Sequence, residues 1–136
     1  MRVVAFLALL LLTGAQAPAG SIGGRWKSPG GNSIIDIAEC GGGLCGTVAW
    51  ASAQAQQAAK KGTEQLIGAQ ILTDLLERSA GQWQGKLFIP DKNMRVTAKL
   101  QLVSPGQLKV SGCLAGRALC KSELWNRSDQ PLPPTQ

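Results

Sequence analysis

The sequence predicts an all-β protein, a small closed antiparallel up-and-down β-barrel of about eight strands with one short helix. Two observations support this prediction. Beyond residue 20, short runs of alternating apolar and polar residues are separated by turns that are rich in Gly, Pro and Asn. The chain also has only 136 residues, and closing so small a sheet into a barrel removes both of its edges. The alternatives are a five-stranded barrel of the OB type and a small sandwich.

The expected strands follow one another along the chain with turn residues between them. They are residues 25–28, 33–40, 44–51, 70–77, 83–89, 95–102, 108–112 and about 119–127. The third strand places Leu44, Gly46, Val48 and Trp50 on one face. The sixth shows the clearest alternation, which is the pattern of a strand that is half buried.

One segment departs from the strand pattern. Residues 51–63 are rich in Ala and Gln and carry Lys60 and Lys61 near their end, which predicts a short helix. Residues 72–78 also have a helical composition. We expect a strand there because the segment faces the next strand across the tight turn at residues 79–81.

The first 19 residues predict a signal peptide. Arg2 precedes an apolar run, residues 3–12, that is shorter than the roughly 20 residues of a membrane span. Small residues at Ala17 and Ala19 predict cleavage after Ala19. We therefore expect a periplasmic or secreted protein that does not span the membrane, with one barrel domain at 20–128 and a Pro-rich flexible tail at 129–136. The alternative is an apolar helix that is kept in the fold.

Four cysteines in an exported small domain predict two disulfides. Cys40 and Cys45 bracket one Gly-containing turn, and Cys113 and Cys120 bracket another. In the chain-entropy model each local bridge contributes about 2 kcal/mol, whereas a Cys40–Cys113 bridge would contribute about 4 kcal/mol. Geometry favours the local pairs, because the turns themselves hold them close. We expect the pairs 40–45 and 113–120.

Basic side chains are concentrated in the C-terminal half of a chain whose net charge is +6. Between residues 81 and 127 the acidic residues are Asp91 and Glu123, against the basic residues Lys86, Lys92, Arg95, Lys99, Lys109, Arg117, Lys121 and Arg127. In an exported protein such a surface favours anionic partners such as lipid head groups or fatty-acid carboxylates, and not nucleic acid. The alternative is that these residues are the solvated outward faces of strands.

The two ends of the predicted barrel sequence resemble those of lipocalins and their calycin relatives. Gly24-Arg25-Trp26 opens the first strand, and Arg127 closes the last. The resemblance implies that Trp26 and Arg127 are a structural pair that closes one end of the barrel. Arg127 would pack over the ring of Trp26 in a cation–π contact worth about 1 kcal/mol.

A wider set of motifs resembles the bacterial envelope family catalogued as domain of unknown function 2147. The motifs are Gly-Arg-Trp-Lys (24–27), Ile-Ile-Asp-Ile-Ala-Glu-Cys (34–40), Leu-Cys-Gly (44–46), Val-Ala-Trp (48–50), Leu-Ile-Gly (66–68), Trp-Gln-Gly-Lys (83–86), Ile-Pro-Asp (89–91), Leu-Lys-Val-Ser-Gly-Cys (108–113) and Leu-Trp-Asn-Arg (124–127). Residues 51–65 depart from the common pattern of that family. The resemblance implies an exported barrel-like domain, and it supplies no activity and no catalytic residues.

The composition argues against an enzyme. The chain has no His, which excludes Ser-His-Asp and Cys-His sites and His-based metal sites. Zinc on the four cysteines is not expected, because six residues separate Cys113 from Cys120 and the thiolates would have to stay reduced. Asp91 and Glu123 would meet only through the tertiary fold. We expect no catalytic residues, no cofactor and no metal.

A binding role fits the sequence better than catalysis. Trp50, Trp83 and Phe88 are candidates to line a barrel interior that holds one small apolar or anionic ligand, with residues 52–69 as a lid at the end opposite Trp26 and Arg127. The alternative for these aromatic residues is a plain core. The alternative function is an envelope interaction or scaffolding protein that acts through a basic outer surface.

Overall fold

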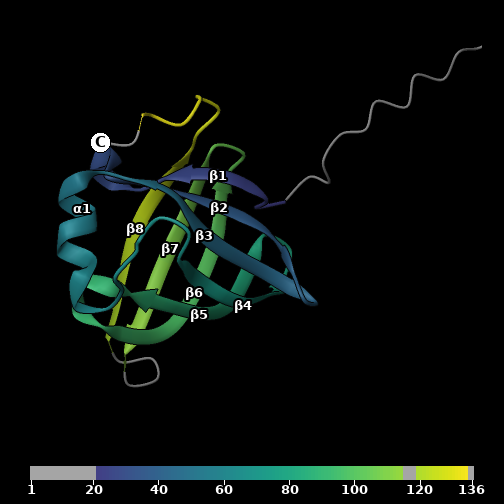
Figure 1. The fold of residues 1–136 in the computed structure, drawn as a ribbon. Coiled ribbons are helices and arrows are strands. Elements are labelled where there is room, and N and C mark those ends of the chain that lie inside the picture. Colours follow the sequence, from purple (N-terminus) through teal and green to yellow (C-terminus); the bar gives the residue numbers. More distant parts are fainter. Residues whose placement is uncertain (1–20, 115–118, 135–136) are drawn as a thin grey trace, which may run out of the picture.

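The protein is a closed barrel of eight antiparallel strands joined in chain order (Figure 1). The structure, a computed structural model, describes residues 21–114 and 119–134, so the predicted signal peptide lies outside it. The strands are β1 (Gly24–Lys27), β2 (Ser33–Cys40), β3 (Gly43–Ala51), β4 (Gln70–Ser79), β5 (Gln82–Ile89), β6 (Met94–Ser104), β7 (Gln107–Leu114) and β8 (Leu119–Arg127). Pairing of β1 with β8 closes the ring. The predicted barrel is confirmed, and the OB-type and sandwich alternatives are wrong.

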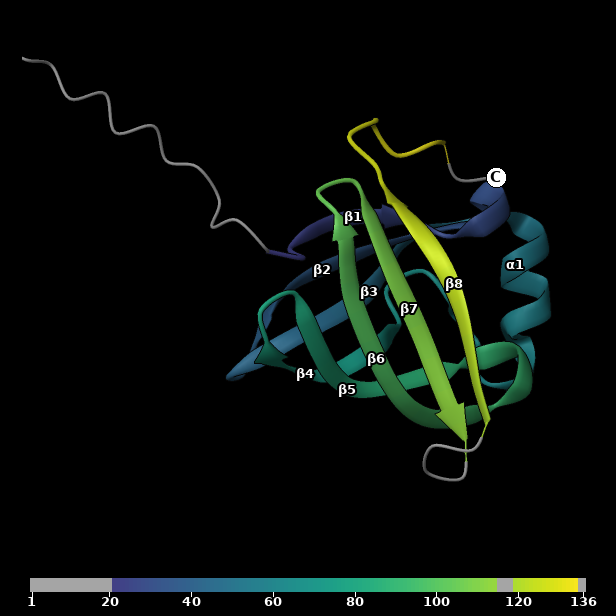
Figure 2. The same cartoon turned by 180° about the vertical axis from the view of Figure 1, so that it is seen from behind.

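The barrel has two ends with different connections. The Arg127 end holds the start of β1, the end of β8 and three tight turns, β2–β3, β4–β5 and β6–β7. The helix end holds the β1–β2 turn, the long β3–β4 connection, the β5–β6 turn and the β7–β8 connection. In Figure 2, β6, β7 and β8 run side by side between these two ends. The position of a residue along its strand therefore indicates which end of the barrel its side chain lies nearer to.

The core lies inside the barrel and extends under the segment that follows β3. Alternate residues of the strands point inward, as the period of two requires. The fully buried inward side chains include Trp26, Ile35, Ile37, Val48, Leu72, Leu75, Leu100 and Leu108. Ile22, which precedes β1, is also fully buried and accepts the hydrogen bond of the Trp26 indole through its carbonyl, at 2.9 Å.

The predicted helix is present but shorter than the Ala- and Gln-rich segment. Helix α1 (Ala53–Ala58) begins after Ser52, whose hydroxyl accepts the Ala55 N–H at 3.1 Å. A 3₁₀ turn, η2 (Ala59–Lys61), continues it and packs against a second 3₁₀ turn, η3 (Pro90–Lys92), between β5 and β6. Ala51 does not belong to the helix because it pairs with Ser33 in the sheet.

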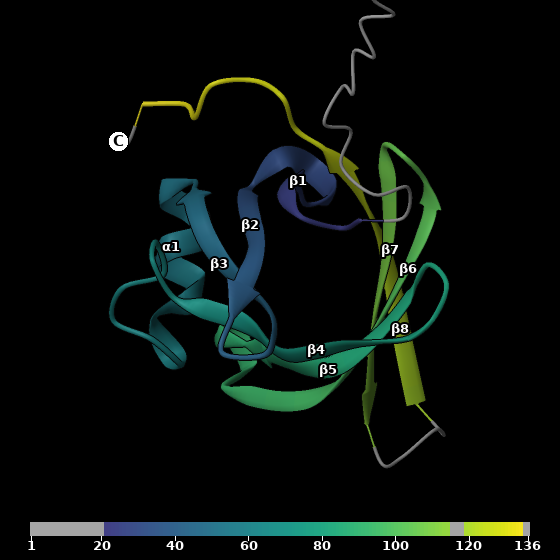
Figure 3. The same cartoon turned by 90° about the vertical axis from the view of Figure 1, so that its right-hand side faces the viewer.

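The α1–η2 segment is anchored to the barrel by apolar side chains. Ala59 and Leu66 are buried in the core cluster, and Ala55 and Ile67 pack against it. Figure 3 shows α1 beside the ends of β2 and β3, away from β7 and β8. The segment thus covers one side of the helix end and leaves the other side uncovered by α1. None of the helices in the described residues is long and apolar enough to cross a membrane.

A β-bulge changes the face on which Trp50 lies. Trp50 pairs with Ile34, whereas Val48 pairs with the next residue, Ile35, so that Ala49 is the extra residue of β3. Ile34 and Ile35 are successive residues of β2, so their side chains point to opposite faces of the sheet. Their partners share those faces, and Trp50 therefore lies on the face opposite Val48. This differs from the single face expected for the third strand, because simple alternation contains no signal for a bulge.

Two disulfides join the cysteines that flank each turn. Cys40 bonds to Cys45 across the β2–β3 turn at the Arg127 end, and Cys113 bonds to Cys120 between β7 and β8 at the helix end. This is the predicted local pairing. Cys113 and Cys120 are also register partners, so the sheet itself brings them together.

Candidate ligand-binding cavity

A cavity of about 740 Å³ opens at the helix end of the barrel. Its walls come mainly from β5 to β8 and from η3, with single residues from the β1–β2 turn, β2 and β4. The lining residues are Ser28, Ser33, Ile71, Leu87, Phe88, Ile89, Pro90, Asp91, Lys92, Met94, Val96, Val110, Gly112, Leu114, Leu119, Cys120, Lys121, Ser122, Glu123 and Trp125. The volume is in the range of small-molecule sites in proteins, which is roughly 300–1,000 Å³.

The inner part of the cavity is apolar. Leu87 and Val96 are register partners on β5 and β6, and Val110 follows on β7. Trp125 lines the cavity although its side chain is 3% exposed. Gly112 leaves space among them, because a Cβ atom at this position would lie 3.1 Å from Val96 Cγ2 and 3.4 Å from Leu87 Cδ2. The wall can therefore contact an apolar ligand group.

Lys121 and Glu123 are charged residues on the inner face of β8. They alternate with Leu119 and Trp125, and their register partners are Gly112 and Val110, which face inward on β7. Both side chains are exposed, and both line the cavity. Glu123 Oε1 accepts the Trp125 indole N–H at 2.6 Å. This bond fixes the Glu123 carboxylate at the cavity wall and satisfies the buried indole donor.

Lys121 and Glu123 are not among the residues that the sequence predicts for a ligand site. The alternation of residues 119–127 is poor because the inward positions of this strand are Leu, Lys, Glu and Trp. The signal that could have found them is the two-residue spacing from Trp125. Once Trp125 is assigned to the interior, the period of two places Glu123 and Lys121 on the same face.

Two further charged residues lie at the rim. Asp91 and Lys92 belong to η3 and line the cavity with Lys121 and Glu123. The fold therefore brings Asp91 and Glu123, which are far apart in sequence, to one cavity. Ser28 and Ser33 complete the polar part of the rim, with their hydroxyl oxygens 2.8 Å apart. No group of His, Cys, Asp or Glu in residues 21–114 and 119–134 has the arrangement of a metal site.

The three predicted aromatic residues do not share this cavity. Phe88 lines it, and the Arg95 guanidinium lies 4.5 Å from the centre of the Phe88 ring. Trp83 is buried and lines a separate pocket at the Arg127 end. Trp50 lines neither pocket, and its buried Nε1–H has no hydrogen-bond acceptor in the described part of the chain. The bulge in β3 and the length of the barrel separate them.

The Arg127 end is closed by the pair that the lipocalin resemblance implied. The Arg127 guanidinium lies 4.2 Å from the centre of the Trp26 ring. It also donates hydrogen bonds to the carbonyl oxygens of Gly23 at 2.8 Å, Pro105 at 2.9 Å and Ser21 at 3.3 Å. These contacts tie the segment before β1 and the β6–β7 turn to the last residue of β8.

The basic residues described in the C-terminal half are divided between the cavity, the Arg127 end and the outer faces of strands. Lys92 and Lys121 line the cavity, and Arg127 packs on Trp26. Lys86 lies 3.8 Å from Asp74 in an ion pair that is largely solvent-exposed. Lys99 and Lys109 point outward, since they alternate with buried residues of β6 and β7. Arg117 lies outside the described residues.

Comparison with known proteins assigns the family. Residues 24–127 match the family model described as "Uncharacterized protein conserved in bacteria (DUF2147)". The chain belongs to this family. The matched region of DUF2147 begins with β1 and ends with the last residue of β8, so it covers the whole barrel. No curated protein is similar enough to this DUF2147 chain to count as a match.

A solved structure resembles this DUF2147 barrel. It is described as "Protein HP1028 from the human pathogen Helicobacter pylori belongs to the lipocalin family". The two chains are 15% identical, the alignment covers 80% of this chain and 84% of the other, and the TM-score is 0.63. At this identity the likeness concerns the fold, and it establishes a lipocalin-like barrel.

Proposed function

We propose that this protein binds a small, mainly apolar ligand that carries an anionic group, in the cavity at the helix end. The observation that carries the proposal is the position and lining of that cavity. It opens at the end opposite the Trp26–Arg127 contact, with apolar walls deep inside and the ammonium group of Lys121 on its inner face. Lipocalin-like barrels have an interior that can hold one small ligand, which supports this role.

The lining favours an amphipathic ligand over a purely apolar one. An apolar tail would contact Leu87, Val96 and Val110, and these contacts would remove apolar surface from water. Lys121 is not part of any ion pair formed within the described residues, so its ammonium group is available to an anionic head group. A carboxylate accepts strong, charge-assisted hydrogen bonds from such a donor.

The proposed role is binding without catalysis. The chain has no His to act as a general base for a Ser or Cys nucleophile. Asp91 and Glu123 share the cavity, but one oxygen of Glu123 already accepts the Trp125 N–H. Under this proposal the ligand is recovered chemically unchanged after incubation with the protein.

We further propose that the protein acts in the periplasm or outside the cell. Two disulfides among the described residues support an oxidising compartment. Expression of the full chain in a bacterium should yield periplasmic protein whose intact mass corresponds to cleavage after Ala19. A protein that stays in the cytoplasm with residues 1–19 attached would contradict this part of the proposal.

The first experiment is native mass spectrometry of protein purified gently from the periplasm, followed by extraction and identification of any bound molecule. The stripped protein is then titrated with dodecanoate and with dodecanol, which has the same chain without the charge. We expect one equivalent of dodecanoate to bind, more tightly than dodecanol, and to change the fluorescence of Trp125. No binding of either molecule, together with a clean apo mass, would refute the proposed function.

Matched variants locate the site. Lys121→Met should weaken dodecanoate binding about three- to tenfold and leave dodecanol binding unchanged. Lys109→Met on the outer face of β7 removes the same charge and should change neither affinity. Leu114→Trp at the cavity rim should weaken binding of both molecules, whereas Leu124→Trp, which faces outward on β8, should not. Equal effects of Lys121→Met and Lys109→Met would contradict the assignment of Lys121.

A further inference from the structure

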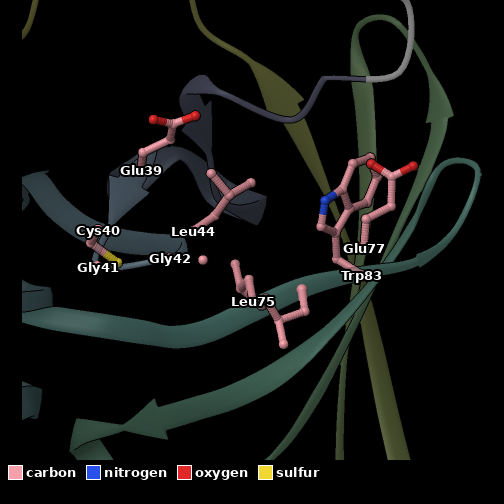
Figure 4. A pocket seen from close by; sticks show the side chains of 10 residues that line it. Glu39, Cys40, Gly41, Gly42, Leu44, Leu75, Glu77 and Trp83 are labelled. Carbon is pink, nitrogen blue, oxygen red and sulfur yellow. The ribbon is translucent and has the colours of Figure 1, made fainter.

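A second pocket, of about 620 Å³, lies at the Arg127 end of the barrel. It is formed by β2 to β5 and by the β2–β3 turn, far along the barrel from the cavity described above. Figure 4 shows the side chains around it. The lining residues are Glu39, Cys40, Gly41, Gly42, Gly43, Leu44, Leu75, Leu76, Glu77 and Trp83.

The sheet register places the chemically important residues of this pocket on one face. Leu44 pairs with Glu39 on one side and with Leu75 on the other, so these three side chains lie in a row across β2, β3 and β4. Glu77 follows Leu75 by two residues and pairs with Trp83 on β5. Because cross-strand partners share a face, both glutamates lie on the inner face of the sheet beside Leu44 and Trp83.

Trp83 has an unused hydrogen-bond donor in this pocket. Its side chain is only 5% exposed, yet its Nε1–H has no acceptor among the described residues. The indole donors of Trp26 and Trp125, by contrast, bond to the Ile22 carbonyl and to Glu123. In Figure 4 the ring nitrogen of Trp83 lies on the side that faces Leu44 and Glu39. The Trp83 side chain is buried while its N–H opens to the pocket, so this donor is available to a ligand with an acceptor oxygen.

The pocket is also acidic within a basic protein. Glu39 and Glu77 are exposed at its edge, and neither forms an ion pair with a cation in residues 21–114 and 119–134. Leu44 and Leu75 form apolar surface between them. Two carboxylates, an aliphatic floor and one N–H donor together match a ligand with a positive group, an apolar chain and an acceptor oxygen.

We propose that this pocket binds a small organic cation, an aliphatic ammonium compound that carries a carbonyl oxygen. Glu39 and Glu77 attract the ammonium group from the two edges of the pocket, Leu44 and Leu75 contact the aliphatic chain, and the Trp83 N–H donates to the carbonyl oxygen. This site is separate from the cavity at the helix end in position and in charge. It does not depend on the function proposed for that cavity.

The test uses N-acetylcadaverine, which has an ammonium group, five methylenes and an amide carbonyl. The ¹H–¹⁵N spectrum of the protein resolves indole N–H signals, and Trp83→Phe identifies the signal of Trp83. We expect N-acetylcadaverine to shift that signal in a saturable way and to leave the signal of Trp125 unchanged. N,N′-Diacetylcadaverine, which is neutral, should produce no saturable shift. No shift with the cation, or equal shifts with both compounds, would overturn the proposal.

A charge-matched pair of variants tests the two carboxylates. Glu39→Gln/Glu77→Gln should raise the Kd for N-acetylcadaverine by at least about tenfold, because both charged acceptors are lost. Glu64→Gln/Asp129→Asn removes two exposed acids elsewhere and should change the Kd by less than about twofold. Similar Kd values for the two variants would show that any binding follows net charge, and would overturn the site. Dodecanoate binding measured in parallel reports on the other cavity independently.

Discussion

Single residues at the Arg127 end hold distant parts of the chain together. Arg127 makes one cation–π contact with Trp26 and donates to three backbone carbonyls, two of them in the segment before β1. Those carbonyls belong to Ser21, Gly23 and Pro105. A planar guanidinium can stack on a ring and donate in several directions at once, which an ammonium group cannot do.

Arg127→Met should therefore lower the free energy of unfolding by about 2 kcal/mol, since it removes the ring contact and leaves carbonyls without their donor. Urea unfolding followed by tryptophan fluorescence measures this change. Arg127→Lys should recover only part of the loss. Arg78→Met, at an exposed site on β4, serves as the control and should change stability little. If the Arg127 and Arg78 variants were equally stable, the closing role of Arg127 would be wrong.

At the scale of elements, the contact between η2 and η3 determines how the helix end is covered. Gly62 follows η2, and a Cβ atom there would lie 2.5 Å from the Pro90 carbonyl oxygen and 3.0 Å from Phe88 Cζ. Any side chain larger than hydrogen at this position would force η2 or η3 to move. Because η3 also carries Asp91 and Lys92, this contact positions part of the cavity rim.

Gly62→Ala should push η2 away from η3 and lower stability by about 1–3 kcal/mol, the usual cost of overpacking. The same change should alter the affinity of the cavity for dodecanoate, because the rim moves. Thermal unfolding and ligand titration report the two effects. Gly106→Ala is the control, because nothing lies within 4 Å of a Cβ atom in that turn. A Gly62→Ala protein with unchanged stability and unchanged affinity would contradict this prediction.

For the whole molecule, the closure between β1 and β8 is the weakest part of the ring. β1 has four residues, and its register with β8 is limited to Trp26–Arg127 and Lys27–Asn126. The pairing of β5 with β6 extends over the full length of β5. Local opening is expected where a short strand forms few backbone hydrogen bonds with its neighbour.

Native-state hydrogen exchange should show this difference. The Ser128 amide, which donates to the Arg25 carbonyl at 2.9 Å, should exchange at least about tenfold faster than the central amides of β6. Arg127→Met should increase the rate at Ser128 and leave β6 unchanged. Equal protection of the two regions would mean that the barrel opens only by global unfolding.

The sequence by itself determined the strands, their order and the disulfide pairing. Short alternating runs with Gly- and Pro-containing turns are local signals, and a meander of consecutive strands uses only neighbours in the chain. The resemblance to lipocalins implied the closing contact of Trp26 with Arg127. It agrees with the topology, because the first and last strands of an even-numbered meander start and finish at the same end. The Cys pairs flank turns, and the turns bring them together.

Only the tertiary structure decided which residues line the two pockets. The bulge between β2 and β3 moved Trp50 to the face opposite Val48, and a bulge is a property of two paired strands. The register partners of Lys121 and Glu123 on β7 place these two residues on the inner face. From the sequence alone, a charged residue on a strand is expected to point outward to the solvent. Glu39, Glu77 and Trp83 line one pocket that is formed by four strands. Alternation along one strand shows which residues share a face of that strand. Which of these residues enclose a cavity depends on the packing of the whole barrel.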